Sequence, residues 1–462
     1  MLMKNRLLSD LKKNLSSSNV LETLEERYVY AQDASNRKHM ENLPDAVVFV
    51  ENTEQVQKVV KLANKYKTPI ICRGAGTNVV GACIPAKTGG IILNFSKMNK
   101  IIEINSENMT AKVEPGVILG DFQKEVEKSG LFYPPDPSNL AVSTIGGSIA
   151  QNSGGAKSFK YGTTKDYIID LKVITADGTI LKTGSNTIKN ATGYNLNTLF
   201  AGSEGTLGII AEATLKLIPK PQEKKVFMAY FDTVKEAVLT VNSIIEQRIF
   251  PATIDFMDKN AIQTVEKFYP ANLLTDKEAA LVIEIDGLAC ALEYQEKVIT
   301  EILKQNNASD IQSSHDDKEY NRIWKARRSS MGACAKLKPN VTTDDVIVPR
   351  ENLAELVLGI RKICEKYNLI VCMVGHVGDG SIHPQIPIDY NNEDEYKRYK
   401  LAKSEIYNLT AELNGIISGE HGIGAEKREQ LPKVINSVAL DYMRQIKKTF
   451  DPNNILNPYK IF

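Results

Sequence analysis

Three histidines and one glutamate in two short glycine-rich segments are the residues of this chain best suited to chemistry. His376 and His383 stand seven residues apart in H-V-G-D-G-S-I-H, where the glycines permit a sharp turn that brings both imidazoles together. Glu420 and His421 are adjacent in G-E-H-G. Two imidazoles and one carboxylate suit Zn²⁺, Fe²⁺ or Mn²⁺. From the spacing alone, hydrogen-bonded structural histidines in glycine turns are an equally good interpretation.

Glycine-rich loops form the second group of candidate residues. They are R-G-A-G-T-N (73–78), P-P-D-P (134–137), S-T-I-G-G (143–147), N-S-G-G (152–155) and G-S-E-G-T-L-G-I (202–209). Glycine lets backbone N–H groups approach a pyrophosphate closely. A tight turn explains any one of these loops but not several extended loops in this order. The first loop departs from G-x-G-x-x-G, so a nicotinamide dinucleotide on a Rossmann unit is not supported.

The elements that must position these segments follow from the apolar periodicity. We expect a strand at 46–50, a helix at 53–66, and a buried strand at 68–74 that enters the first glycine loop. A hairpin is expected over 167–182, with Asp177-Gly178 as its turn. The apolar run before His376 predicts that this residue ends a strand.

The length of 462 residues predicts two domains rather than one. The composition changes after residue 221, where strand-like and helix-like segments begin to alternate in a pattern typical of an antiparallel sheet with helices. We therefore expect a first domain at 1–221, a second at 222–415, and a C-terminal segment at 416–462 that returns to the first domain. Leucines spaced four residues apart within 1–20 predict one amphipathic helix at the start.

The bulk composition argues against several classes of protein. Lys+Arg total 57 and Asp+Glu total 56, which gives no net field that would favour nucleic acid. Six cysteines without a C-x-x-C pair support neither a disulfide framework nor an iron–sulfur cluster, and scattered thiols suit the cytoplasm. We expect no transmembrane span, because no apolar run reaches about 18 residues.

Taken together, R-G-A-G-T, P-P-D-P, T-I-G-G-S-I-A-Q-N-S-G-G and G-S-E-G-T-L-G-I resemble the vanillyl-alcohol oxidase and p-cresol methylhydroxylase flavoproteins, and within them the glycolate oxidase FAD subunit and D-lactate dehydrogenase group. The resemblance implies an α+β fold: an FAD-binding domain of the p-cresol methylhydroxylase type, followed by an α+β cap domain with an antiparallel sheet. Some relatives attach the flavin through a histidine where Thr77 stands, so we expect non-covalent FAD. The implied FAD contacts are Arg73, Gly74, Ala75, Gly76, Thr77, Asn78, Gly81, Pro135, Ser143, Thr144, Gly146, Gly147, Asn152, Gly154, Gly155, Glu204, Gly205, Gly208, Ile209, Ile210 and Asn457.

The same resemblance assigns roles to the polar residues. His376, His383 and Glu420 match the family's metal ligands, and His421 matches its base. W-K-A-R places Arg327 where the family binds the substrate carboxylate, and a guanidinium suits that task because it donates two parallel hydrogen bonds. Relatives that act on 2-hydroxyglutarate have a lysine near the position of Thr343, so its absence favours a monocarboxylate.

We therefore expect FAD-dependent oxidation of a small D-2-hydroxy acid, D-lactate or glycolate, assisted by a divalent metal (Zn, Fe or Mn). His421 would accept the hydroxyl proton while FAD takes the hydride. Electrons would leave through a protein acceptor, either an electron-transfer flavoprotein or an iron–sulfur subunit. The alternatives are a D-2-hydroxyglutarate-type dehydrogenase, an ether-lipid synthase of the same fold, and a non-catalytic flavoprotein subunit of a larger complex.

Overall fold

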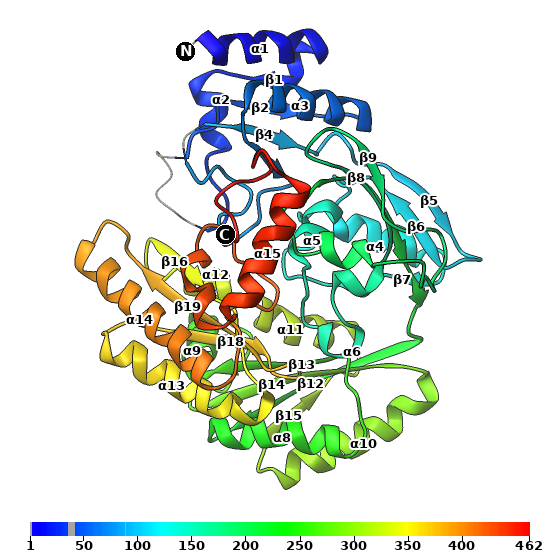
Figure 1. The fold of residues 1–462 in the computed structure, drawn as a ribbon. Helices are drawn as coiled ribbons and strands as arrows, with labels where there is room; N and C mark the ends of the chain where they lie inside the picture. The colour runs from blue at the N-terminus through cyan, green and yellow to red at the C-terminus, as the bar shows by residue number, and fades with distance from the viewer. Residues whose placement is uncertain (1, 36–41, 88) are drawn as a thin grey trace.

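The computed structural model describes residues 2–35, 42–87 and 89–462. Two bodies follow each other along the chain, and the C-terminal segment runs back from the second to the first (Figure 1). All six cysteines are free thiols. None of the helices in the described part of the chain combines the length and the apolar composition needed to cross a bilayer.

The chain opens with a small sheet covered by helices. Its strands run in the order β1-β2-β4-β3, and β2, β4 and β3 are parallel. The elements are α1 (Leu2–Asn14), β1 (Val20–Leu21), α2 (Leu24–Val29), β2 (Ala46–Phe49), α3 (Thr53–Tyr66), β3 (Ile70–Arg73) and β4 (Ile91–Asn94).

Helix α3 has the predicted bounds because both ends carry local signals. Asn52 accepts a hydrogen bond from the backbone of Gln55, and Lys67 adopts a left-handed conformation at the other end. The first helix is shorter than the predicted 1–20: it ends at Asn14, before a run of serines, and Val20 already begins a strand. Met1, the first residue of that prediction, lies outside the described residues.

A five-stranded antiparallel sheet completes the first body, in the order β5-β6-β10-β8-β9. The predicted hairpin is confirmed as β8 and β9, and Gly178 takes the left-handed conformation that its turn requires. The strands are β5 (Ile101–Asn105), β6 (Thr110–Val113), β8 (Ile168–Ile174), β9 (Ile180–Lys182) and β10 (Ile209–Lys216). The connecting elements are α4 (Leu119–Glu127), β7 (Leu131–Phe132), α5 (Ile145–Gln151), α6 (Ser158–Tyr161), α7 (Leu196–Phe200) and β11 (Ile218–Pro219).

The second body is built on one large antiparallel sheet, in the order β15-β12-β14-β13-β18-β19-β16, with β17 paired to β19. This sheet confirms the predicted cap domain. The strands are β12 (Glu223–Phe231), β13 (Thr253–Asp258), β14 (Ala279–Gly287), β15 (Ser309–Ser313), β16 (Asn340–Thr343), β17 (Val346–Ile347), β18 (Cys372–His376) and β19 (Ser381–Ile388). The helices are α8 (Val234–Glu246), α9 (Lys259–Phe268), α10 (Ala289–Gln305), α11 (Asp317–Arg328), α12 (Ser330–Cys334), α13 (Leu353–Lys366) and α14 (Glu393–Glu412).

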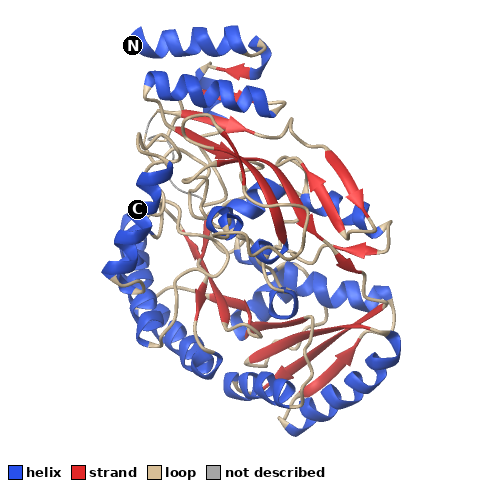
Figure 2. Cartoon of the chain, turned by 45° about the vertical axis from the view of Figure 1, so that its right-hand side comes forward, coloured by secondary structure: helices blue, strands red, loops and turns tan. Residues whose placement is uncertain are grey.

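Successive strand residues point to opposite sides of this sheet, and both sides carry buried apolar side chains. Helices therefore cover both faces. Ile254 and Phe256 of β13 pack in one core with α8, α10, α13 and α14, whereas Met257 packs in the other with α9, α11 and α12. Figure 2 shows the long helices along the outer side of the sheet. The inner face, which carries α11, is turned toward the first body.

The C-terminal segment ties the two bodies together. Helix α15 (Ser437–Phe450) places Ile446 and Phe450 against the core of the five-stranded sheet. Further on, Ile70 donates its backbone N–H to Ile455, beside β3. The loop between α14 and α15, which contains Glu420 and His421, is therefore held between the two bodies.

Candidate active site

A cavity of about 800 Å³ lies between the two bodies, and both groups of candidate residues line it. From the glycine loops it receives Arg73, Gly74, Ala75, Gly76, Thr77, Asn78, Ser143, Thr144, Gly146, Gly147, Glu204, Gly205, Gly208 and Ile210. From the second body and the C-terminal loop it receives Arg327, His376, His383, Glu420 and His421. The tertiary fold thus brings the dispersed loops to one place.

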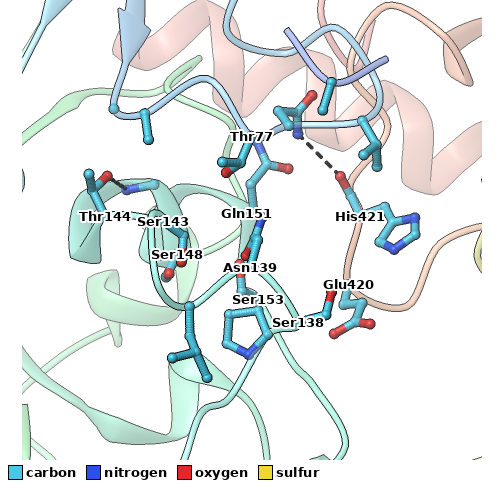
Figure 3. Close-up of a pocket in the computed structure, with 18 of the residues that line it drawn as sticks. Thr77, Ser138, Asn139, Ser143, Thr144, Ser148, Gln151, Ser153, Glu420 and His421 are labelled. Carbon is cyan, nitrogen blue, oxygen red and sulfur yellow. Dashed lines mark hydrogen bonds between the residues drawn. The ribbon is translucent and has the colours of Figure 1, made fainter. Parts of the chain in front are cut away.

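The walls of the cavity suit a nucleotide cofactor. Two of the glycine loops approach each other closely at this wall, since a Cβ on Gly74 would lie 2.2 Å from Thr144 Oγ1 and only glycine fits there. The side-chain oxygens of Ser143, Ser148 and Gln151 are buried and have no hydrogen-bond partner among the described residues. Buried polar atoms in native proteins are nearly always paired, so these three are suited to a polar ligand. In Figure 3, Ser143, Thr144 and Ser148 lie on the side of the cavity opposite Glu420 and His421.

Seven of the expected FAD contacts lie outside the lining: Gly81, Pro135, Asn152, Gly154, Gly155, Ile209 and Asn457. Several of them support the loops that do line it. Asn457 donates to the backbone oxygens of Ala82 and Glu204, and so joins two glycine loops. Asn152 accepts hydrogen bonds from Thr163 and Lys165 just past the end of α5.

His376, His383 and Glu420 meet at one point of the cavity, with one possible ligand atom from each within 4.8 Å of the others. The Nε2 atoms of both histidines lie 3.4 Å from Glu420 Oε1. His376 ends strand β18, as predicted, and His383 lies on the paired strand β19. Two imidazoles and the half-buried Glu420 carboxylate are donor types that bind a divalent cation, so such a cation would fit there.

A carboxylate that the sequence interpretation missed stands behind this cluster. Asp255 Oδ1 lies 2.6 Å from His376 Nδ1, and Asp255 Oδ2 lies 2.7 Å from Arg327 Nε. Helix α11 presents Arg327 because Tyr320 and Trp324, on the same helix, donate to the buried carboxylate of Glu284 at 2.6 and 2.8 Å. The guanidinium of Arg327 is therefore fixed at the wall of the cavity.

The loop that carries Glu420 and His421 is held by a second missed carboxylate. Asp345 Oδ2 accepts hydrogen bonds from the backbone N–H groups of Gly419, Glu420 and His421, at 2.7, 2.7 and 3.0 Å. Its Oδ1 lies 3.8 Å from His383 Nδ1. The ring of His383 in turn stacks on that of His421, with centroids 5.0 Å apart.

A carboxylate from the first body holds the same loop on its other side. Glu204 accepts from the backbone N–H groups of Ile423 and Gly424, at 2.6 and 2.8 Å. Burial raises the pKa of Glu204 to about 7, although these hydrogen bonds oppose the shift. The carboxylate of the G-S-E-G segment is thus engaged by protein backbone.

The electrostatics distinguish the two ligand histidines. Burial disfavours the charged form of His376, but Asp255 and Glu420 outweigh burial and raise its pKa well above the usual value. For His383, burial lowers the pKa to about 4, so its imidazole is neutral at pH 7. A neutral imidazole is the form that binds a metal.

The missed residues left only faint signals in the sequence. Asp255 interrupts T-I-D-F-M-D, a strand that is otherwise suited to burial, and Asp345 follows another aspartate before an apolar run. A buried carboxylate requires partners, so an acidic residue inside an apolar strand could have been flagged. Ser148 and Gln151 lie on the short helix after a glycine loop and carry no signal of their own.

Comparisons with known proteins agree with this architecture. A family model described as "FAD linked oxidases, C-terminal domain" matches residues 220–461, and one described as "FAD binding domain" matches residues 44–184. The chain therefore belongs to the FAD-linked oxidase family, and it is an FAD-dependent oxidoreductase. These two family matches confirm the expected FAD cofactor.

Individual relatives cover nearly the whole chain. The glycolate oxidase subunit GlcD of Bacillus subtilis (strain 168) is 42% identical over 436 residues, or 94% of this chain and 92% of that protein. A D-lactate dehydrogenase of Anaerostipes hadrus is 34% identical over 428 residues, or 90% of this chain and 89% of that protein. A D-2-hydroxyglutarate dehydrogenase of Stutzerimonas stutzeri (strain A1501) is 30% identical over 465 residues, or 99% of this chain and 98% of that protein.

Solved structures confirm the expected fold. The structure of p-cresol methylhydroxylase with substrate bound matches with a TM-score of 0.84 at 20% identity, covering 99% of this chain and 96% of that one. An alkyldihydroxyacetonephosphate synthase matches with a TM-score of 0.78 at 22% identity, covering 98% and 85%. At such identities the likeness concerns the fold alone.

Proposed function

We propose that this protein oxidises a small D-2-hydroxy acid, D-lactate or glycolate, to the 2-oxo acid with the help of a divalent cation. The observation that carries the proposal is the meeting of His376, His383 and Glu420 in the cavity that the FAD loops line, beside Arg327 and His421. A scaffold subunit would have no use for this set of groups. The relatives named above as glycolate oxidase subunit and D-lactate dehydrogenase support the same class of substrate.

The chain's own residues would divide the work as follows. Arg327 would bind the substrate carboxylate through its two terminal nitrogens, because its Nε already faces Asp255. His421 would accept the hydroxyl proton on a ring nitrogen; its Nδ1 is buried without a partner among the described residues. When bound, FAD accepts a hydride, and a divalent cation held by His376, His383 and Glu420 stabilises negative charge on oxygen.

The electrons would pass on to a partner protein, an electron-transfer flavoprotein or an iron–sulfur subunit. The description of one relative as a subunit supports a complex of this kind. Anaerobic reduction followed by oxygen or by an artificial dye tests this step. Fast reoxidation by oxygen alone would contradict the need for a protein acceptor.

The main test is anaerobic mixing of purified protein with D- and L-lactate, glycolate and D-2-hydroxyglutarate while flavin absorbance is recorded. We expect rapid bleaching with D-lactate or glycolate, and slow bleaching with the dicarboxylate because Thr343 offers it no cation. His421→Asn should keep FAD and slow bleaching about 10²- to 10⁴-fold. Bleaching at the wild-type rate in that variant, or after removal of metal with a chelator, would contradict the mechanism.

A further inference from the structure

The side chain of Asp255 connects the histidine–glutamate cluster with Arg327. It lies on β13, opposite His376 on the neighbouring strand β18. It is only 1% exposed, and each of its two oxygens has a different partner: Oδ1 faces His376 Nδ1 at 2.6 Å, and Oδ2 faces Arg327 Nε at 2.7 Å. One carboxylate therefore touches both a member of the histidine–glutamate cluster and the candidate substrate arginine.

The fold alone does not call for a charge at this position. Every residue of β13 is buried, and a lone carboxylate inside an apolar sheet costs several kcal/mol unless it is paired. A buried ion pair is often replaceable by apolar residues without loss of stability. The position of Asp255 is thus better explained by what it does to its two partners.

We propose that Asp255 is a positioning residue that fixes the cation site and the carboxylate site at a set separation. By accepting a hydrogen bond from His376 Nδ1–H, Asp255 orients the ring so that Nε2, on the side of Glu420, is the nitrogen available to a metal. The ion pair between Asp255 Oδ2 and Arg327 Nε, at 2.7 Å, leaves both terminal nitrogens of the guanidinium for a carboxylate. This inference rests on the proposed function.

The arrangement also bears on the substrate. Because Asp255 contacts both His376 Nδ1 and Arg327 Nε, it would hold the cation site and the carboxylate site at one separation. A 3-hydroxy acid has one more carbon between its hydroxyl and its carboxylate than a 2-hydroxy acid, so one separation does not suit both. Loss of Asp255 would therefore weaken the discrimination between 2-hydroxy and 3-hydroxy acids.

The test uses Asp255→Asn in the FAD-loaded protein, with Zn²⁺ as the probe. The amide can accept from only one of the two donors, so at least one contact is lost. We expect zinc affinity, measured by competition with a chromogenic chelator, to fall about 10- to 100-fold. At saturating zinc, KM for D-lactate should rise about tenfold or more, and discrimination against 3-hydroxybutyrate should weaken, while FAD content stays that of the wild type.

Asp258→Asn is the matched control, because Asp258 is a buried aspartate of the same strand that faces Arg361 on the other side of the sheet. It should leave zinc affinity and KM within about threefold of the wild type. If Asp255→Asn loses FAD, Asp255→Ser is measured in its place. Zinc affinity and KM that both stay within about threefold of the wild type in the Asp255 variant would overturn the bridge. Wild-type protein that binds no divalent cation would contradict the proposed function itself, and the bridge with it.

Discussion

Replacing Asp345 by asparagine tests whether this carboxylate holds the loop that carries Glu420 and His421. Its Oδ2 accepts three backbone hydrogen bonds at 2.7, 2.7 and 3.0 Å, and its side chain is fully buried. Asparagine keeps the shape and one acceptor oxygen but removes the charge.

The magnitude follows from the three bonds. A hydrogen bond to a charged acceptor contributes about 1.5–3 kcal/mol and a neutral one about 0.5–1.5 kcal/mol, so each bond loses about 1 kcal/mol. The three weakened bonds together lower the free energy of unfolding by about 3 kcal/mol. For a domain of about 200 residues this corresponds to a fall in apparent Tm of about 6–12 °C. Because Glu420 loses its fixed position, zinc affinity should also fall about tenfold or more.

The assay combines thermal unfolding followed by fluorescence with zinc competition, on wild type, Asp345→Asn and Ser418→Ala. The serine hydroxyl donates the longest of the hydrogen bonds to Asp345 Oδ2, at 3.3 Å, so its removal should cost less than about 1 kcal/mol. An Asp345→Asn protein that matches the wild type in both Tm and zinc affinity would refute the argument that this carboxylate orders the loop.

Three further predictions concern the cavity wall and the cap sheet. Arg327→Lys should raise KM for D-lactate about 10- to 100-fold with FAD retained, because an ammonium cannot make the paired hydrogen bonds; an unchanged KM would exclude Arg327 as the carboxylate site. Thr343→Lys should lower KM for D-2-hydroxyglutarate relative to D-lactate about tenfold, and steady-state kinetics that show no relative change would contradict that assignment. Burial raises the pKa of Asp258 to about 6, so its contribution to stability is present below about pH 4 and is lost as pH rises through 6. As the pH rises from 5 to 7, the free energy of unfolding of Asp258→Asn should therefore increase by about 1.4 kcal/mol relative to that of the wild type, as measured by chemical unfolding. A difference in the free energy of unfolding that stays constant with pH would disprove the pKa shift.

Local sequence patterns predicted those elements whose signals are local. The apolar face of α3 and its capping asparagine gave correct bounds, and Asp177-Gly178 correctly predicted the β8–β9 hairpin. The first helix was predicted too long, because the leucine spacing continues past Asn14 while the serines that follow favour other conformations. Periodicity reports which face is buried and says less about where an element ends.

The candidate site also has residues that the sequence indicates and residues that it does not. The histidine, glutamate and glycine segments could be recognised because their residue types and spacing are themselves unusual, and the structure brings His376, His383 and Glu420 within 4.8 Å. Which glycine-loop residues line the cavity could not be read from the sequence: Asn152 and Asn457 instead bind neighbouring loops. The roles assigned to individual residues stay predictions.

The family, the FAD cofactor and the small set of side chains around which a site could form follow from the amino-acid sequence alone, because they depend on residue types at short spacing. Which carboxylates support that set depends on the three-dimensional fold. Asp255 and Asp345 lie 121 and 38 residues from the histidines they face, on separate strands or loops. Contacts over such separations arise from the pairing of strands and the packing of the two bodies, which no local pattern of residues encodes.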